Sequence, residues 1–139
     1  MDIQLIGKQA FVCGSTQGIG KAVAIELANM GAQVTLCARN ESALAAVAQE
    51  LDRSHGQQHN YVVADFSQPD QLEKIMEAYA LQTSACHILI NNTGGPAAGT
   101  ALDADPAAYL AAFQMHLVCN QLLVQKLVPL MKQQQYGRI

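Results

Sequence analysis

The chain alternates short, largely apolar runs with longer stretches in which apolar residues recur at helical spacing. Largely apolar runs of strand length lie at residues 10–13, 34–37, 61–64 and 86–90. Stretches with helical spacing lie at residues 19–30, 41–54, 68–82 and 106–134. Strands of this kind are typical of a parallel sheet that is covered by helices on both faces. Right-handed crossovers then favour a doubly wound sheet, so we expect an α/β, Rossmann-like fold.

Polar residues, glycine and proline mark several helix boundaries. Asn40, Ser67 and Asp105 each precede a helical stretch, where their side chains are expected to cap the first turn. Asp105 is followed by a proline, which is favoured at the first helical position. Gly31 is placed to end the first helix, and Pro129 predicts a kink in the last one.

Composition narrows the partners and the compartment. The chain has 139 residues, 50% of them hydrophobic and 14% charged, which suits one folded domain. Its net charge of −3 and the lack of adjacent Lys or Arg residues argue against nucleic acid as a partner. The apolar runs are far shorter than a membrane span and residues 1–12 hold no secretory signal, so we expect a cytoplasmic protein without membrane contact. The four cysteines lie far apart without CxxC spacing, which favours buried thiols over a disulfide or a metal site.

A glycine-rich loop follows the first predicted strand and opens the first predicted helix. The pattern is Gly14-x-x-x-Gly18-x-Gly20. Glycines let the backbone approach a pyrophosphate closely, and the helix N-terminus supplies unpaired N–H donors and a positive dipole end. Turns also collect glycines for steric reasons alone, but the position at the first strand–helix junction favours a dinucleotide site.

The end of the second predicted strand bears on the choice of cofactor. An acidic residue there would bind the ribose 2′-hydroxyl of NAD, whereas a basic residue accommodates the 2′-phosphate of NADP. This chain has Cys37-Ala38-Arg39-Asn40, with no acid before Glu41. A guanidinium suits the geometry of a phosphate, so Arg39 indicates NADP, with NAD the less favoured cofactor. The alternative is a solvated arginine at a strand end.

Together these motifs resemble the short-chain dehydrogenase/reductase family. The resemblance rests on the glycine loop, on Asp65 after the third predicted strand and on Asn91–Gly94 after the fourth. Residues 127–132 and 136–139 resemble the end of that family's long helix and the start of its fifth strand. The resemblance implies an incomplete sheet that ends at the start of strand five, with residues 1–139 the dinucleotide-binding part of a single truncated domain. Residues 91–96 resemble the 3-oxoacyl-acyl-carrier-protein reductase-like branch.

The resemblance assigns cofactor contacts residue by residue. Asp65 would contact the adenine, although a carboxylate there also fits a turn or a helix cap. Asn92 would lie against the cofactor ribose and Gly94 would give backbone clearance, whereas the Asn91 amide would tie neighbouring strands together. The residues expected to line the cofactor site are Gly14, Thr16, Gly18, Ile19, Gly20, Arg39, Asp65, Asn92 and Gly94.

Three positions depart from that family's pattern. Cys13 stands where a threonine is usual, so a hydroxyl that would brace the glycine loop is missing. Thr93 replaces the usual alanine, which is a mild change. His116 stands where the family's helix carries an asparagine that helps to hold a proton-relay water. Its imidazole either takes part in such a relay or is a packed side chain.

The family's catalytic serine and Tyr-x-x-x-Lys pair would lie beyond the start of the fifth strand. In that pair the tyrosine is the general acid or base and the lysine lowers its pKa. No tyrosine in residues 1–139 is followed by a lysine four positions later. We therefore assign no catalytic residue and no metal ligand, and expect residues 1–139 to be inactive on their own.

The leading hypothesis is the N-terminal, cofactor-binding part of an NADP(H)-dependent short-chain reductase that interconverts a carbonyl and a secondary alcohol. A 3-oxoacyl thioester is the first substrate hypothesis. One alternative is a non-catalytic nucleotide-binding or interaction module, and another is a non-functional truncated product. The resemblance also implies homo-oligomers that pack through the long last helix.

Overall fold

The computed structural model describes residues 3–139. Its strands are β1 (Gln9–Cys13), β2 (Gln33–Ala38), β3 (Asn60–Val63) and β4 (Ile88–Ile90). They form a four-stranded parallel sheet in the order β3-β2-β1-β4. The first strand lies inside the sheet because the chain crosses over in one direction as far as β3 and then returns to the other side of β1. The predicted α/β fold with a parallel sheet is confirmed.

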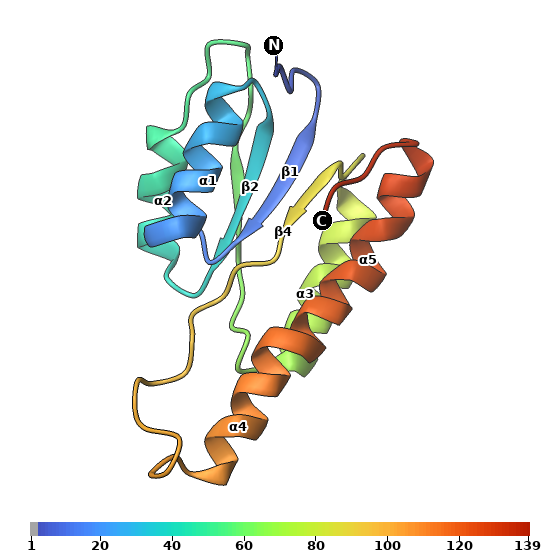
Figure 1. The fold of residues 1–139 in the computed structure, drawn as a ribbon. Coiled ribbons are helices and arrows are strands. Elements are labelled where there is room, and N and C mark those ends of the chain that lie inside the picture. Colours follow the sequence, from blue (N-terminus) through green and yellow to red (C-terminus); the bar gives the residue numbers. More distant parts are fainter. Residues whose placement is uncertain (1–2) are drawn as a thin grey trace.

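Helices cover both faces of this sheet (Figure 1). α1 (Gly18–Asn29) and α2 (Glu41–Glu50) lie on one face, and α3 (Pro69–Gln82) and α5 (Cys119–Gln133) lie on the other. The core accordingly divides into two apolar clusters, with Val12 in the α1–α2 layer and its neighbours Phe11 and Cys13 in the α3–α5 layer. Because successive strand residues face opposite layers, both faces of β1 are buried, which explains its apolar sequence.

The helix starts follow their sequence signals with one exception. The side chains of Asn40 and Asp105 accept a backbone N–H of the following turn, as predicted. Ser67 does not cap α3, because the helix begins two residues later and its N-cap is Gln68, which makes no side-chain cap bond. The Ser67 N–H instead donates to Asp65 Oδ1 at 2.8 Å. The Asp65 carboxylate therefore organises this turn, which is one of its two expected roles.

The last helical stretch contains an irregularity that the sequence did not predict. It consists of α4 (Pro106–Phe113), the π-helical segment η1 (Gln114–Val118) and α5. Pro129 lies inside α5, which continues to Gln133. The wider π turn falls where the helix passes from α4, which buries no residue, to α5, which buries Leu123 and Leu127. A π turn redirects the side chains that follow it, which accounts for the change from an unburied to a buried helix face at this point.

The same stretch bears on an expectation about length. Pro106–Gln133 spans 28 residues and contains a window of mean hydropathy 1.3 that is 11% buried, so by length and composition it is able to cross a membrane. The prediction concerned uninterrupted apolar runs and did not consider a long helix of mixed apolar and polar residues such as this one. Core helices of soluble proteins meet the same criterion.

The end of the chain lies beside β4. Arg138 forms a parallel bridge with Ile88. The Leu89 N–H donates to the Arg138 carbonyl at 2.9 Å, and the Arg138 N–H donates to the His87 carbonyl at 3.0 Å. These bonds place residues 137–139 where the start of a fifth strand is expected.

Candidate functional site

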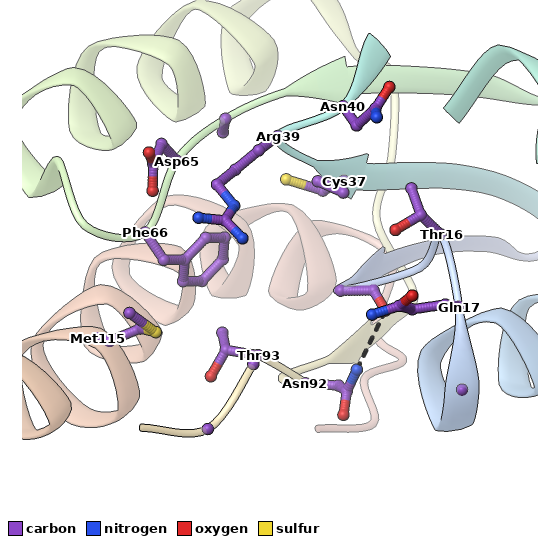
Figure 2. A pocket seen from close by; sticks show the side chains of 16 residues that line it. Thr16, Gln17, Cys37, Arg39, Asn40, Asp65, Phe66, Asn92, Thr93 and Met115 are labelled. Carbon is purple, nitrogen blue, oxygen red and sulfur yellow. Dashed lines mark hydrogen bonds between the residues drawn. The ribbon is translucent and has the colours of Figure 1, made fainter. Parts of the chain in front are cut away.

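A cavity of about 450 Å³ opens at the carboxyl ends of the four strands (Figure 2). In open α/β sheets, ligands bind at this edge, next to the point where the strand order reverses. Here the order reverses between β1 and β4. The cavity is lined by Gly14, Thr16, Gln17, Gly18, Cys37, Ala38, Arg39, Asn40, Ala64, Asp65, Phe66, Asn92, Thr93, Gly94, Gly95 and Met115.

Most residues predicted to hold a cofactor meet in this cavity. Those present are Gly14, Thr16, Gly18, Arg39, Asp65, Asn92 and Gly94. Ile19 and Gly20 are absent from the lining, since the Ile19 side chain is 75% exposed and Gly20 is buried behind the loop. That Ile19 and Gly20 contact the cofactor stays a prediction. We expect such a contact to involve their backbone N–H groups.

The lining also contains nine residues that were not predicted, namely Gln17, Cys37, Ala38, Asn40, Ala64, Phe66, Thr93, Gly95 and Met115. Gln17 and Phe66 sit directly beside predicted residues in the chain, so their positions in the loops after β1 and β3 were the available signal. Met115 comes from η1, far along the chain, and no local pattern marks it. Only the packing of the long helix brings it to the cavity.

The glycine loop is packed so tightly that side chains do not fit at two of its positions. Gly14 has φ +58°, and a Cβ there would lie 2.6 Å from Asn92 Nδ2. A Cβ on Gly20 would lie 2.7 Å from the same nitrogen and would press on the Gly14 carbonyl group. Gly18 differs, because its φ of +56° favours glycine while the space beside it is open. The loop thus holds its backbone close to the first turn of α1.

Asn92 ties this loop to the end of β4. Its Nδ2 donates to the carbonyl oxygens of Cys13 (3.3 Å) and Gly14 (3.2 Å). Figure 2 marks one hydrogen bond of Asn92 with a dashed line. Sequence reasoning gave the strand-tying role to the neighbouring Asn91, whose Oδ1 is buried without a hydrogen-bond partner in residues 3–139. That assignment is corrected: the side chain that reaches β1 is Asn92. Successive residues at a strand end point to opposite sides, and the sequence did not show which side faces the loop.

Ser15 supplies the bracing hydroxyl that the sequence analysis found missing. Its side chain is fully buried, and its Oγ accepts the Cys37 N–H at 3.0 Å. This bond joins the glycine loop to the end of β2. The loop, which lacks a hydroxyl at Cys13, is therefore braced by the hydroxyl two residues later.

The N-terminus of α1 has unpaired donors. Its N-cap is Gln17, which makes no side-chain cap bond, and no acidic residue lies in the first turn. The first N–H groups of a helix have no partner within the helix itself. Together with the positive end of the helix dipole, they suit an anionic group beside Gly18.

Arg39 provides a second anion-binding group at the opposite wall. It is exposed at the end of β2, and its guanidinium extends toward the Phe66 ring (Figure 2). In the part of the chain that the structure describes, the salt bridges are Lys21–Glu50 and Lys126–Glu73, and neither involves Arg39. Its donors are therefore available to a phosphate or carboxylate ligand.

Two buried thiols, Cys13 and Cys86, are not set up as nucleophiles. Cys13 and Cys37 are register partners in β1 and β2, and both are fully buried. A hydrogen bond with the Cys37 thiol, together with burial, raises the pKa of the Cys13 thiol well above its usual value. Burial also raises the pKa of Cys86 to about 11. Because the thiolate is the reactive form, Cys13 and Cys86 stay neutral and unreactive near pH 7.

His116 contacts the cavity wall indirectly. Its Nδ1 lies 2.8 Å from the Thr93 hydroxyl, and both residues are half-buried. Thr93 lines the cavity, whereas His116 is absent from the lining. The structure thus gives His116 a hydrogen-bonding role toward the loop after β4.

The parallel sheet, the glycine loop and the cavity at the switch point define a Rossmann-like α/β protein of the nucleotide-binding type. The chain matches the short chain dehydrogenase family over residues 8–139 and belongs to that family. A tropinone reductase homolog from Arabidopsis thaliana is 36% identical over 136 residues, which cover 97% of this chain and 51% of the relative. The chain spans about half the length of such curated relatives, or less.

Solved structures agree over nearly the whole chain. An L-sorbose reductase from Gluconobacter frateurii, complexed with NADPH and L-sorbose, superposes with a TM-score of 0.87 at 28% identity, covering 99% of this chain and 52% of its own. A 3-oxoacyl (acyl-carrier-protein) reductase from Agrobacterium tumefaciens C58 with NADP bound gives 0.85 at 26% identity, covering 98% and 52%. Proteins with different named substrates thus match this chain equally well. The comparisons therefore do not favour the 3-oxoacyl-acyl-carrier-protein reductase-like branch over other branches of the family.

Proposed function

We propose that residues 1–139 are the cofactor-binding part of an NADP(H)-dependent short-chain oxidoreductase that interconverts a carbonyl and a secondary alcohol. The observation that carries this proposal is the pairing of two anion-binding groups in one cavity, the uncapped N-terminus of α1 and the guanidinium of Arg39. NADP(H) carries a pyrophosphate and a 2′-phosphate, one for each group. The solved neighbours that hold NADPH or NADP support the same choice. When bound, the nicotinamide gives or takes the hydride.

Each wall of the cavity has its own role in this proposal. The first turn of α1 at Gly18 binds the pyrophosphate through backbone N–H groups, and Arg39 binds the 2′-phosphate. We assign the adenine contact to Asp65, which lines the cavity and whose Oδ1 accepts the Ser67 N–H. Both Nδ2 protons of Asn92 are used on the loop, so its Oδ1 is the atom that would meet a ribose hydroxyl.

Binding of NADPH is the direct test. We expect Arg39→Ala to weaken NADPH binding about tenfold to hundredfold, the range for a lost charge-assisted hydrogen bond, and to leave NADH binding unchanged. Fluorescence titration with each cofactor measures both constants. Arg138→Ala is the matched control, because it removes the same charge beside β4 at His87 and Ile88, away from the cavity lining. Equal affinity of the unsubstituted chain for NADPH and NADH would contradict the role of Arg39.

The substrate is part of the proposal. A 3-oxoacyl thioester is our first choice, supported by the resemblance of residues 91–96 and by the 3-oxoacyl reductase among the neighbours. The sorbose reductase favours a sugar ketone instead, so assays should include both classes. We further propose that turnover needs groups beyond residues 1–139; NADPH oxidation by these residues with any such ketone would refute this. The rival, a non-catalytic binding module, predicts cofactor binding without turnover in any longer form.

Association and location also remain proposals. Tyr109, Leu110 and Phe113 of α4 and Leu117 of η1 are each more than half exposed. We propose that this apolar stretch packs against a second copy, as the family resemblance implies. Sedimentation velocity decides between monomer and oligomer. A cytoplasmic location stays a prediction from the sequence.

A further inference from the structure

The segment that follows β4 forms one wall of the cavity without regular secondary structure. Residues 91–100 adopt neither helix nor strand, and Asn92, Thr93, Gly94 and Gly95 all line the cavity. Asn92 is tied to the glycine loop through its amide. Beyond Asn92 the segment must be held by some other contact if the wall is to keep its shape.

That contact is the hydrogen bond between Thr93 and His116. Thr93 Oγ1 and His116 Nδ1 lie 2.8 Å apart and join positions separated by 23 in sequence. Within residues 3–139, no other hydrogen bond connects residues 93–99 to a helix or strand. This single bond therefore links the segment to the long helix.

The helical segment that carries His116 also contributes a residue to the cavity lining. His116 lies in η1, and the preceding residue, Met115, lines the cavity opposite the glycine loop (Figure 2). Local π-helical turns occur often at functional sites, where they redirect side chains. The bond thus joins two walls of one cavity, the Thr93 segment and η1.

We propose that Thr93 and His116 are a positioning pair that holds the wall formed by residues 93–95 in the shape that accepts the dinucleotide. The inference rests on the proposed function, because it assigns the wall to cofactor binding. A hydroxyl both donates and accepts, so the bond forms with a neutral or a protonated imidazole. His116 does not line the cavity, and its effect on the ligand passes through Thr93.

NADPH titration of single and double variants tests the pair. Thr93→Val and His116→Leu each remove the bond and are expected to weaken NADPH binding by about threefold to tenfold, the usual worth of one hydrogen bond. The double variant should lose no more than either single one, because both remove the same bond. Thr93→Ser and His116→Asn keep a hydrogen-bonding atom at each position and should bind like the unsubstituted protein.

The matched control is Thr100→Val, which makes the same change in the same segment. Its hydroxyl bonds to Asp103 within the loop and Thr100 does not line this cavity, so NADPH binding should not change. Amide hydrogen exchange of residues 93–99 without cofactor gives a second readout, and exchange should speed up in Thr93→Val but not in Thr93→Ser.

Two failures can be told apart. If the unsubstituted protein does not bind NADPH, the proposed function fails and the pair has no cofactor to position. A different result would refute the pairing alone. The unsubstituted protein would bind NADPH, and either His116→Leu would bind it equally well or the losses of the two single variants would add in the double variant. The cofactor site would then stand without the pair.

Discussion

Replacing Gly20 by alanine tests how closely the glycine loop is packed against α1. Gly20 is the third residue of the helix and its φ is not in the left-handed region, so its backbone alone would accept any residue. The obstacle is space. An added Cβ would lie 2.7 Å from Asn92 Nδ2 and 2.8 Å from the Gly14 carbonyl carbon. Neither group rotates away freely, because one is backbone and the other is held by two hydrogen bonds.

Whether Gly20→Ala raises or lowers the free energy of unfolding depends on two opposing contributions. Alanine is better than glycine inside a helix by up to about 1 kcal/mol. Overpacking a tight site costs about 1–3 kcal/mol, and contacts this short against backbone place Gly20 at the upper end. The net loss is then about 2 kcal/mol, which lowers the melting temperature of a chain of this size by roughly 6–10 °C. NADPH affinity should fall too, because Gly14 and Asn92 both line the cavity.

Thermal unfolding by circular dichroism and NADPH titration measure the two effects. Gly99→Ala is the matched control, since nothing lies within 4 Å of a Cβ there and its φ is ordinary. It should shift stability by less than about 0.5 kcal/mol. If Gly20→Ala melts at the temperature of the unsubstituted chain and binds NADPH equally well, the close packing of loop and helix described above is incorrect.

Two further predictions concern the core and the pH. Leu127→Ala should cost about 2–5 kcal/mol in urea titrations because this side chain is fully buried, whereas Leu81→Ala, at a residue 84% exposed, should change stability by less than about 0.5 kcal/mol. Burial lowers the pKa of His59 below 6.5, and its Nδ1 accepts the Val34 N–H at 3.1 Å. The unfolded chain therefore binds a proton first as the pH falls, so stability is complete above pH 6.5 and declines below it. His59→Asn should reduce the difference between the urea midpoints at about pH 7.5 and about pH 5.5. If that difference is unchanged, groups other than His59 cause the pH dependence of stability.

Much of the fold was predictable because its signals are local. The alternation of strand and helix, the caps Asn40 and Asp105 and the helix end at Gly31 follow from residue spacing within a few positions. Ser67 does not cap the helix because α3 begins at Pro69, which leaves the N-cap position to Gln68. The π turn at Gln114–Val118 was not predicted because no proline marks it, whereas the kink at Pro129 stays a prediction.

The candidate site likewise contains some features that were predictable from the sequence and others that were not. The position of Arg39 at a strand end was visible in the sequence, and the cavity includes it. The separate roles of Asn91 and Asn92 were not, because they depend on which side of β4 faces the glycine loop. Two departures from the family pattern, Thr93 and His116, looked independent in the sequence and are one hydrogen bond in the structure.

By itself, the sequence of this protein determined the alternating elements, the parallel sheet and the glycine loop, because periodicity and turn chemistry act between neighbours in the chain. Only the tertiary structure decided that Ser15 braces the loop on β2, that Asn92 joins β4 to β1, that Met115 lines the cavity and that His116 bonds to Thr93. These contacts span long separations in sequence. They exist because the helices pack on the sheet in one particular rotation, which no local pattern specifies.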